Sequence, residues 1–303
     1  TGVVSATINE QFGGAGLNFL SATALLEKVG KYAAPIPALE TIVMGALPIQ
    51  EFGNESQKSE LLPKISEGEL IVTTALTFSK QATAEAESVS GSFDFVSYGL
   101  EADIFLVPTN TGVYIVESAS TGVSLQPRET TTGNPQAALT LDNVNSQQLG
   151  TVTAEEFMTW IRLRIDSGIC SIMAGACEAS LDLASEYTKI RQQFDRAIAT
   201  FQAVSQRAGD AYIDTEAVRL TSRQAAWRIS SGLPATEQVA IARWWASEAG
   251  FRVVHASTHL HGGVGVDRDY PLHRFFLLVR QLELTLGNSE EQLEKIGNLL
   301  AAQ

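Results

Sequence analysis

The sequence predicts an α+β protein with helices at the N-terminus, an antiparallel β-barrel or sandwich in the middle, and a four-helix bundle at the end. Apolar residues recur at helical spacing within 1–69, short β-rich runs fill 70–150, and long helical periods return in 151–303. We therefore expect three domains with these boundaries. A chain of 303 residues, 45% of them hydrophobic, is long enough for two or three packed units.

The first region begins with a glycine-rich loop, Phe-Gly-Gly-Ala-Gly-Leu at 12–17. Apolar residues at helical spacing follow in 20–29 and stop at Gly30, ahead of two prolines. The loop does not follow a strand and has no Lys-Ser/Thr tail, so it does not have the pattern of a nucleotide-binding P-loop. We expect it to be a connection before the first long helix.

Six short runs in the middle region are typical of strands, because they are apolar and are separated by Gly, Asn, Pro and Ser/Thr turns. The runs are 70–76, 92–98, 104–107, 113–116, 123–125 and 138–141. Their close spacing predicts a small antiparallel barrel or sandwich between the two helical regions.

The pattern of the last region predicts four antiparallel helices. Thr153 and Glu156 have the spacing of a capping box, so a long helix begins here and continues to Arg191. The next helices cover about 201–229 and about 235–260. A fourth follows Pro271, is broken at Gly287 and resumes with Ser289 as its cap. Helices of this length form a bundle.

The net charge and the composition exclude some classes of binding partner. A formal net charge of −13 argues against nucleic acid and against an anionic membrane surface. No run of about 18 apolar residues is present and the start lacks a basic segment, so we expect neither a membrane span nor a signal peptide. Cys170 and Cys177 lie two turns apart on one helix, too far to form a disulfide. We therefore expect buried thiols in a reducing compartment, the cytoplasm.

A basic and aromatic group lies where the first long helix of the last region ends. Arg191, Gln193 and Phe194 would project from this end. A guanidinium offers two parallel donors to phosphate oxygens, and amide and aromatic groups can hold a base or a ribose. Alone, such an arginine is more often a solvated residue that complements the helix dipole.

A second motif lies about seventy residues further on, in the sequence His-Leu-His-Gly-Gly-Val-Gly that begins at His259. Here a helix runs into glycines and the chain then enters a helix started by Pro271, so bare backbone can approach a ligand closely. His255 and His259 share a helix face, but a third ligand at metal-binding spacing is not evident, which disfavours zinc.

Together, in this order, the two motifs strongly resemble the acyl-CoA dehydrogenase family of flavoproteins. In that family an Arg-x-Gln-Phe turn and a Gly-Gly-x-Gly turn grip the FAD pyrophosphate and adenosine of the neighbouring subunit. The resemblance therefore implies FAD as cofactor, an acyl-CoA thioester as substrate and an electron-transfer flavoprotein as acceptor. It assigns FAD contacts to Arg191, Gln193, Phe194, His261, Gly262, Gly263 and Gly265. The family usually has further helices before residue 1, so we also expect an N-terminal piece to precede this sequence.

The implied reaction is α,β-dehydrogenation, in which a carboxylate removes the α proton while a hydride leaves Cβ for the flavin. The family's commoner position for this base counts to Leu286, which cannot take a proton. The rarer position counts to Ile165, with Asp166 adjacent. Asp166 could serve if the helix were rotated by one residue, roughly 100°. Glu283 and Glu290 lie on other turns and are expected to be solvated.

The places that match the family's own flavin-ring contacts, 74–81 and 93–99, depart from its pattern. Groups that reach a neighbour's FAD are thus retained, whereas those serving the subunit's own flavin are altered. This combination resembles the α2β2 acyl-CoA dehydrogenases of steroid side-chain degradation, and implies a homologous partner subunit and a bulky acyl-CoA. Two alternatives remain: a self-sufficient homotetramer with Asp166 as base, and a non-enzymatic relative that binds acyl-CoA or protein.

Overall fold

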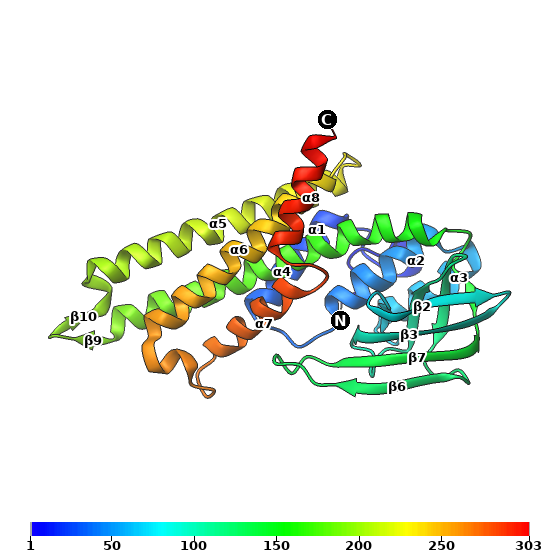
Figure 1. The fold of residues 1–303 in the computed structure, drawn as a ribbon, viewed down its shortest axis with the longest axis horizontal. Coiled ribbons are helices and arrows are strands. Elements are labelled where there is room, and N and C mark those ends of the chain that lie inside the picture. Colours follow the sequence, from blue (N-terminus) through cyan, green and yellow to red (C-terminus); the bar gives the residue numbers. More distant parts are fainter. Residues whose placement is uncertain (1, 303) are drawn as a thin grey trace. The chain divides into compact units, whose positions relative to one another are not determined.

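The computed structural model describes residues 2–302 and confirms an α+β fold with helices at both ends and sheets between them (Figure 1). The chain divides into two compact units. One comprises Thr1–Ala22 and Pro35–Ile165 and is called the sheet unit here, and the other comprises Thr23–Ala34 and Asp166–Gln303 and is called the helical unit. Two helices, α1 (Phe19–Lys31) and α4 (Ala154–Ile190), contribute residues to both units.

Four short helices belong to the sheet unit: η1 (Glu10–Phe12), η2 (Leu39–Ala46), α2 (Leu47–Phe52) and α3 (Glu55–Glu67). The π-helix η2 is buried along its whole length. Asn54 caps α3 in a reciprocal capping box, because its side chain accepts from the Gln57 amide at 2.9 Å and its own amide donates to the Gln57 side chain at 3.0 Å. Gln57 also donates to the Gln148 carbonyl at 2.8 Å, which ties α3 to the sheets.

The eight strands of this unit form two four-stranded sheets, in the orders β1-β4-β5-β8 and β2-β3-β7-β6. Their bounds are β1 (Val72–Thr74), β2 (Phe78–Glu85), β3 (Ser88–Ser97), β4 (Ile104–Pro108), β5 (Val113–Glu117), β6 (Val123–Arg128), β7 (Gln136–Asn145) and β8 (Gln147–Gln148). Side chains from both sheets share one core, in which Phe93, Phe105 and Leu139 are buried.

The two sheets match the sandwich alternative of the prediction and do not close into a barrel. One ladder is not antiparallel, because β1 pairs with β4 in parallel. The sequence pattern also missed β2 and β8. Strand β2 is polar, and its buried residues Ala82 and Ala84 are too small to produce an apolar signal. It becomes a strand because it pairs with β3 at the edge of its sheet.

The helical unit is built on three long helices, which are α4 and the helices α5 (Gln202–Ser230) and α6 (Thr236–His261) (Figure 1). The shorter elements are β9 (Gln192–Gln193), β10 (Arg196–Ala197), η3 (Ile198–Thr200), η4 (Gly262–Val266), α7 (Leu272–Leu284) and α8 (Ser289–Ala301). Within the described residues, no helix is long and apolar enough to cross a bilayer.

Helix boundaries followed local signals closely. The Thr153 hydroxyl accepts from the Glu156 amide at 3.2 Å, which confirms the expected cap of α4. The cap expected at Ser289 was wrong by one residue. Asn288 has the extended backbone of a cap and its side chain accepts from the Glu291 amide at 3.1 Å, so Ser289 is already the first helical residue.

Helix α1 packs on α4 through two glycines. A Cβ on Gly30 would lie 1.9 Å from the Ile172 carbonyl oxygen, and one on Gly175 would lie 1.8 Å from that of Glu27. The backbones therefore touch, and no larger residue fits at either position. Cys170 and Cys177, on the same part of α4, are free and buried as expected, and burial raises the pKa of each thiol to about 12.

Candidate cofactor-binding site

A tight hairpin, rather than a simple helix end, presents the first motif. Strands β9 and β10 pair directly after α4, and Phe194 and Asp195 form the two-residue turn with φ of 53° and 62°. Both values are left-handed, as in the type I′ turn whose twist suits hairpins, although this turn favours Asn and Gly. The turn holds Phe194 in solvent with 87% of its surface exposed, and its ring meets Phe201 edge-on.

Arg191 lies at the base of this hairpin and is exposed. Its backbone is well fixed: its amide donates to the Tyr187 carbonyl at 2.9 Å, and its carbonyl accepts from the Ile198 amide at 2.8 Å. In the described part of the chain, no carboxylate pairs with its guanidinium. Gln193 is also exposed, and its side-chain amide donates to the Gln192 carbonyl at 2.8 Å. The hairpin thus presents a cation, an amide and an aromatic ring to solvent.

The glycine turn η4 exposes bare backbone. Gly262 has φ 60° and ψ −134°, a conformation that residues with a Cβ avoid. A Cβ built on Gly262 or on Gly263 would meet no atom within 4 Å, so open space lies in front of both. Gly265 has a different reason to be glycine, because its Cβ would lie 2.5 Å from the Thr258 carbonyl oxygen. Two glycines therefore leave room for a ligand and one permits close packing.

An aromatic contact brings the two motifs together. The His261 ring stacks on Tyr187 of α4 with centroids 4.5 Å apart. Tyr187 is one helical turn before Arg191, and His261 directly precedes the glycine turn. Tyr270, just before α7, adds a hydrogen bond to His261 Nε2 at 3.1 Å. Neither tyrosine was predicted as part of the site, although Tyr187 belongs to the apolar helical pattern that leads to the hairpin.

The His261 ring faces inward, since only 3% of the residue is exposed. Its Nδ1 lies 2.7 Å from the Ser257 carbonyl oxygen, so it must donate there, and Nε2 is left to accept from the Tyr270 hydroxyl. Burial lowers the pKa of His261, which favours this neutral form. With both ring nitrogens bonded internally, His261 orients the glycine turn and does not offer its ring to a ligand.

Neither expected base position presents an accessible carboxylate. Asp166 is 1% exposed, and its Oδ1 lies 3.5 Å from Nε of Arg243, which is fully buried. Leu286 lies between α7 and α8 and has φ 61°, a rare conformation for leucine. Glu283 is not simply solvated, because it pairs with Arg280 and burial raises its pKa.

The segments expected to correspond to flavin-ring contacts lie in the sheet unit. Thr74 ends β1, is buried, and donates its hydroxyl to the Met44 carbonyl at 2.5 Å. Phe93 is buried in β3. Both side chains therefore serve the packing of that unit.

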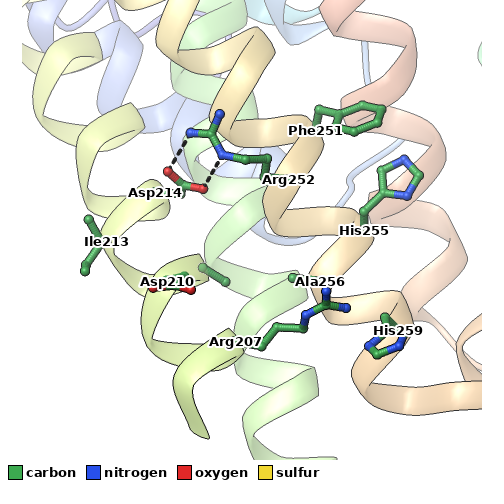
Figure 2. A pocket seen from close by; sticks show the side chains of 10 residues that line it. Arg207, Asp210, Ile213, Asp214, Phe251, Arg252, His255, Ala256 and His259 are labelled. Carbon is green, nitrogen blue, oxygen red and sulfur yellow. Dashed lines mark hydrogen bonds and ion pairs between the residues drawn. The ribbon is translucent and has the colours of Figure 1, made fainter. Parts of the chain in front are cut away.

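A groove of about 710 Å³ lies between α5 and α6 (Figure 2). Arg207, His255 and His259 line it on one side of the ion pair between Arg252 and Asp214, whose atoms approach to 2.7 Å. His255 packs against the ring of Phe251 at 4.1 Å, and burial lowers its pKa. Across residues 2–302, no group of three metal-ligating side chains gathers at the histidines or elsewhere.

Both ends of the chain match models of one protein family. The family model described as "Acyl-CoA dehydrogenase, N-terminal domain" matches residues 1–69, and "Acyl-CoA dehydrogenase, C-terminal domain" matches residues 150–300. The chain is 36% identical over 320 residues to Acyl-CoA dehydrogenase FadE27 of Mycobacterium tuberculosis, and the match covers 99% of this chain and 86% of that protein.

Two solved structures are similarly close. The ChsE4-ChsE5 complex from Mycobacterium tuberculosis matches with a TM-score of 0.94 and 36% identity over 100% of this chain and 86% of that one. The "Tcur3481-Tcur3483 steroid ACAD G363A variant" matches with a TM-score of 0.92 and 33% identity over 99% and 86% of the two chains. With both terminal regions and nearly the full length matched, this chain belongs to the acyl-CoA dehydrogenase family of oxidoreductases.

Proposed function

We propose that this chain is a subunit of an FAD-dependent acyl-CoA dehydrogenase and contributes contacts for the FAD adenosine and pyrophosphate to a homologous partner's active site. The observation that carries this proposal is the stacking of Tyr187 on His261, with ring centroids 4.5 Å apart. It joins the exposed hairpin to the open glycine turn, so that one end of the helical unit offers both.

The residues of this end fit such a ligand. The pyrophosphate is a doubly charged anion, which suits the exposed guanidinium of Arg191. Gly262 and Gly263 have open space where a Cβ would stand, so backbone groups can be approached there. Phe194 and Gln193 offer an aromatic face and an amide to the adenosine. When bound, FAD would supply the hydride acceptor, while these residues bind and orient it.

Proton abstraction is assigned to the partner. Leu286 is apolar, and the Asp166 carboxylate is buried against Arg243, so neither expected position offers a base to a substrate. A partner base then acts on an acyl-CoA whose hydride acceptor this chain helps to hold. The ChsE4-ChsE5 and Tcur3481-Tcur3483 structures support the partner arrangement, because each is named for two components.

The Tcur3481-Tcur3483 protein is called a steroid ACAD, and we extend this to a steroid or other bulky acyl-CoA as substrate here. An α2β2 assembly, an electron-transfer flavoprotein as acceptor and a cytoplasmic location complete the proposal. The substrate, the assembly, the electron acceptor and the location are proposed for the assembled enzyme.

The test is to express this chain alone and together with a homologous subunit, and to measure bound flavin by absorbance and subunit composition by native mass spectrometry. We expect flavin only in the co-expressed complex, at one FAD for two chains. One FAD per chain in the protein alone would contradict the shared site and favour a self-sufficient enzyme using Asp166. No flavin in either preparation would favour a non-enzymatic relative.

A further inference from the structure

Arg243 on α6 is the largest fully buried side chain of the described residues. Its guanidinium reaches the last turn of α7 and the loop beyond it. Nη2 donates to the Leu282 carbonyl oxygen at 2.8 Å, to that of Thr285, and to that of Gly287 at 3.4 Å. On its other side, Nε faces Asp166 Oδ1 at 3.5 Å. One buried cation thus connects α4, α6 and the α7–α8 loop.

Burial of a guanidinium is strongly unfavourable unless opposite charge and acceptors surround it. Here Asp166 supplies the charge and three carbonyls supply the acceptors. The carbonyls of Leu282 and Thr285 are at the end of α7, where the last C=O groups lack i+4 partners and the dipole is negative, and that of Gly287 lies in the loop beyond. Arg243 therefore caps α7 from a neighbouring helix, and Asp166 makes its burial tolerable.

The capped carbonyls of Thr285 and Gly287 stand on either side of Leu286. Leu286 has φ 61° and Gly287 has φ 119°, so the chain makes a left-handed turn. Leucine avoids this conformation, and it persists only where surrounding contacts impose it. The next residue, Asn288, caps α8 through its bond to the Glu291 amide. The direction of α8 therefore depends on the turn that Arg243 holds.

We propose that Asp166 and Arg243 form a positioning clamp that holds the Leu286–Gly287 turn and the start of α8. The clamp lies near the N-terminal end of α6 and fastens the C-terminal end of α7. The glycine turn η4 lies in the connection between α6 and α7. The clamp joins the opposite ends of these two helices. Asp166 acts here as the counter-ion of Arg243 and not as a base, whether or not the chain shares its FAD site.

The test is hydrogen exchange of the intact protein, followed by mass spectrometry of peptides covering 282–292, with peptides of α5 as the internal reference. Arg243→Met removes the donors at similar volume, and we expect exchange in 282–292 to become about tenfold faster or more while α5 is unchanged. Asp166→Asn should act in the same direction. Arg243→Lys keeps the positive charge but loses the planar set of guanidinium donors. It serves as the test variant if Arg243→Met does not fold.

Two further variants separate positioning from general stability. The double variant Asp166→Leu with Arg243→Met removes both charges, so we expect its Tm to return toward the wild-type value while 282–292 stays unprotected. The matched control is Asp214→Asn with Arg252→Met, a partly exposed pair between α5 and α6 with a shorter contact of 2.7 Å. It should lower Tm only slightly and leave exchange in 282–292 unchanged.

Unchanged exchange of 282–292 in folded Arg243→Met or Arg243→Lys would overturn the clamp, as would an equal effect of the control pair. Loss of dehydrogenase activity in Asp166→Asn, with exchange of 282–292 unaltered, would also overturn it and would return Asp166 to the role of a base.

Discussion

Arg191 and Arg243 belong to the same helical unit but have opposite surroundings. Arg191 stands in solvent at the end that also carries the glycine turn, and within the described residues no carboxylate pairs with it. Arg243, near the N-terminal end of α6, is buried, donates to three carbonyls and is ion-paired with a carboxylate. The same side chain is thus available for a ligand at one end and used for architecture at the other. The difference predicts that substitutions at the two ends will separate binding from stability.

The largest effect is expected at the buried end. Asp166→Asn leaves the Arg243 guanidinium without its counter-charge, so the free energy of unfolding should fall by about 3–5 kcal/mol. Chemical denaturation measures this value. Asp214→Asn, in the partly exposed pair with Arg252, is the control and should cost less than about 1 kcal/mol. Equal losses in the two variants would show that burial does not distinguish the pairs.

At the exposed end, Arg191→Ala should weaken FAD binding by the assembled enzyme by about 10- to 100-fold, because the proposed charge-assisted hydrogen bond to phosphate would be lost. Its unfolding free energy should stay within about 0.5 kcal/mol of the wild type. Flavin titration and denaturation measure the two quantities. Lys189→Ala removes a nearby exposed cation and is the control; if it weakens FAD binding as strongly, a general electrostatic attraction explains the effect better than a specific contact.

Two neighbouring glycines of the turn η4 allow binding and stability to be separated, because they differ in backbone conformation. Gly262 has positive φ and Gly263 does not, while both face open space. Gly262→Ala should reduce stability by about 1–3 kcal/mol and also weaken FAD binding. Gly263→Ala should weaken FAD binding with stability unchanged. Thermal unfolding measures the stability and flavin titration measures FAD binding. Normal FAD binding in Gly263→Ala would place the ligand away from this backbone.

The smallest effect concerns pH at His261. Burial lowers its pKa in the folded protein, so the unfolded chain binds the proton more readily. The resulting stability is complete above the ordinary histidine pKa of about 6.5 and is lost as pH falls through the lower folded value. The Tm of His261→Gln should therefore fall less steeply than that of the wild type as the pH drops below about 6.5. His255→Gln, at a more exposed ring, is the comparison, and an unchanged slope in His261→Gln would show that the fall arises elsewhere.

Helix limits and motifs could be predicted well from the sequence because they depend on neighbours within a few residues. Thr153 caps α4 through a bond to the amide three residues on, and α1, α5 and α6 follow their apolar spacing. The resemblance to a family also rested on short motifs around Arg191 and Gly262, and the full-length matches confirm it. The FAD contacts themselves remain predictions.

Other features depended on residues far apart in the chain. The two sheets around Phe93 and Phe105 match the sandwich alternative of the prediction, but their strand order rests on distant pairings such as Val72 of β1 with Ile104 of β4. Asp166 is a candidate base in the sequence because it adjoins Ile165, the family's rarer base position. Nothing near it in the sequence signals its pairing with Arg243, 77 positions away.

The sequence by itself therefore determined the long helices, the cap of α4, the family and the residues of its two motifs, since local hydrogen bonds and spacing encode them. Only the tertiary structure decided which arginine is exposed and which is buried, and that Tyr187 and His261 join the hairpin to the glycine turn. The reason is physical: burial and pairing of charge are properties of the surroundings that packing creates, and the same residue type serves either role.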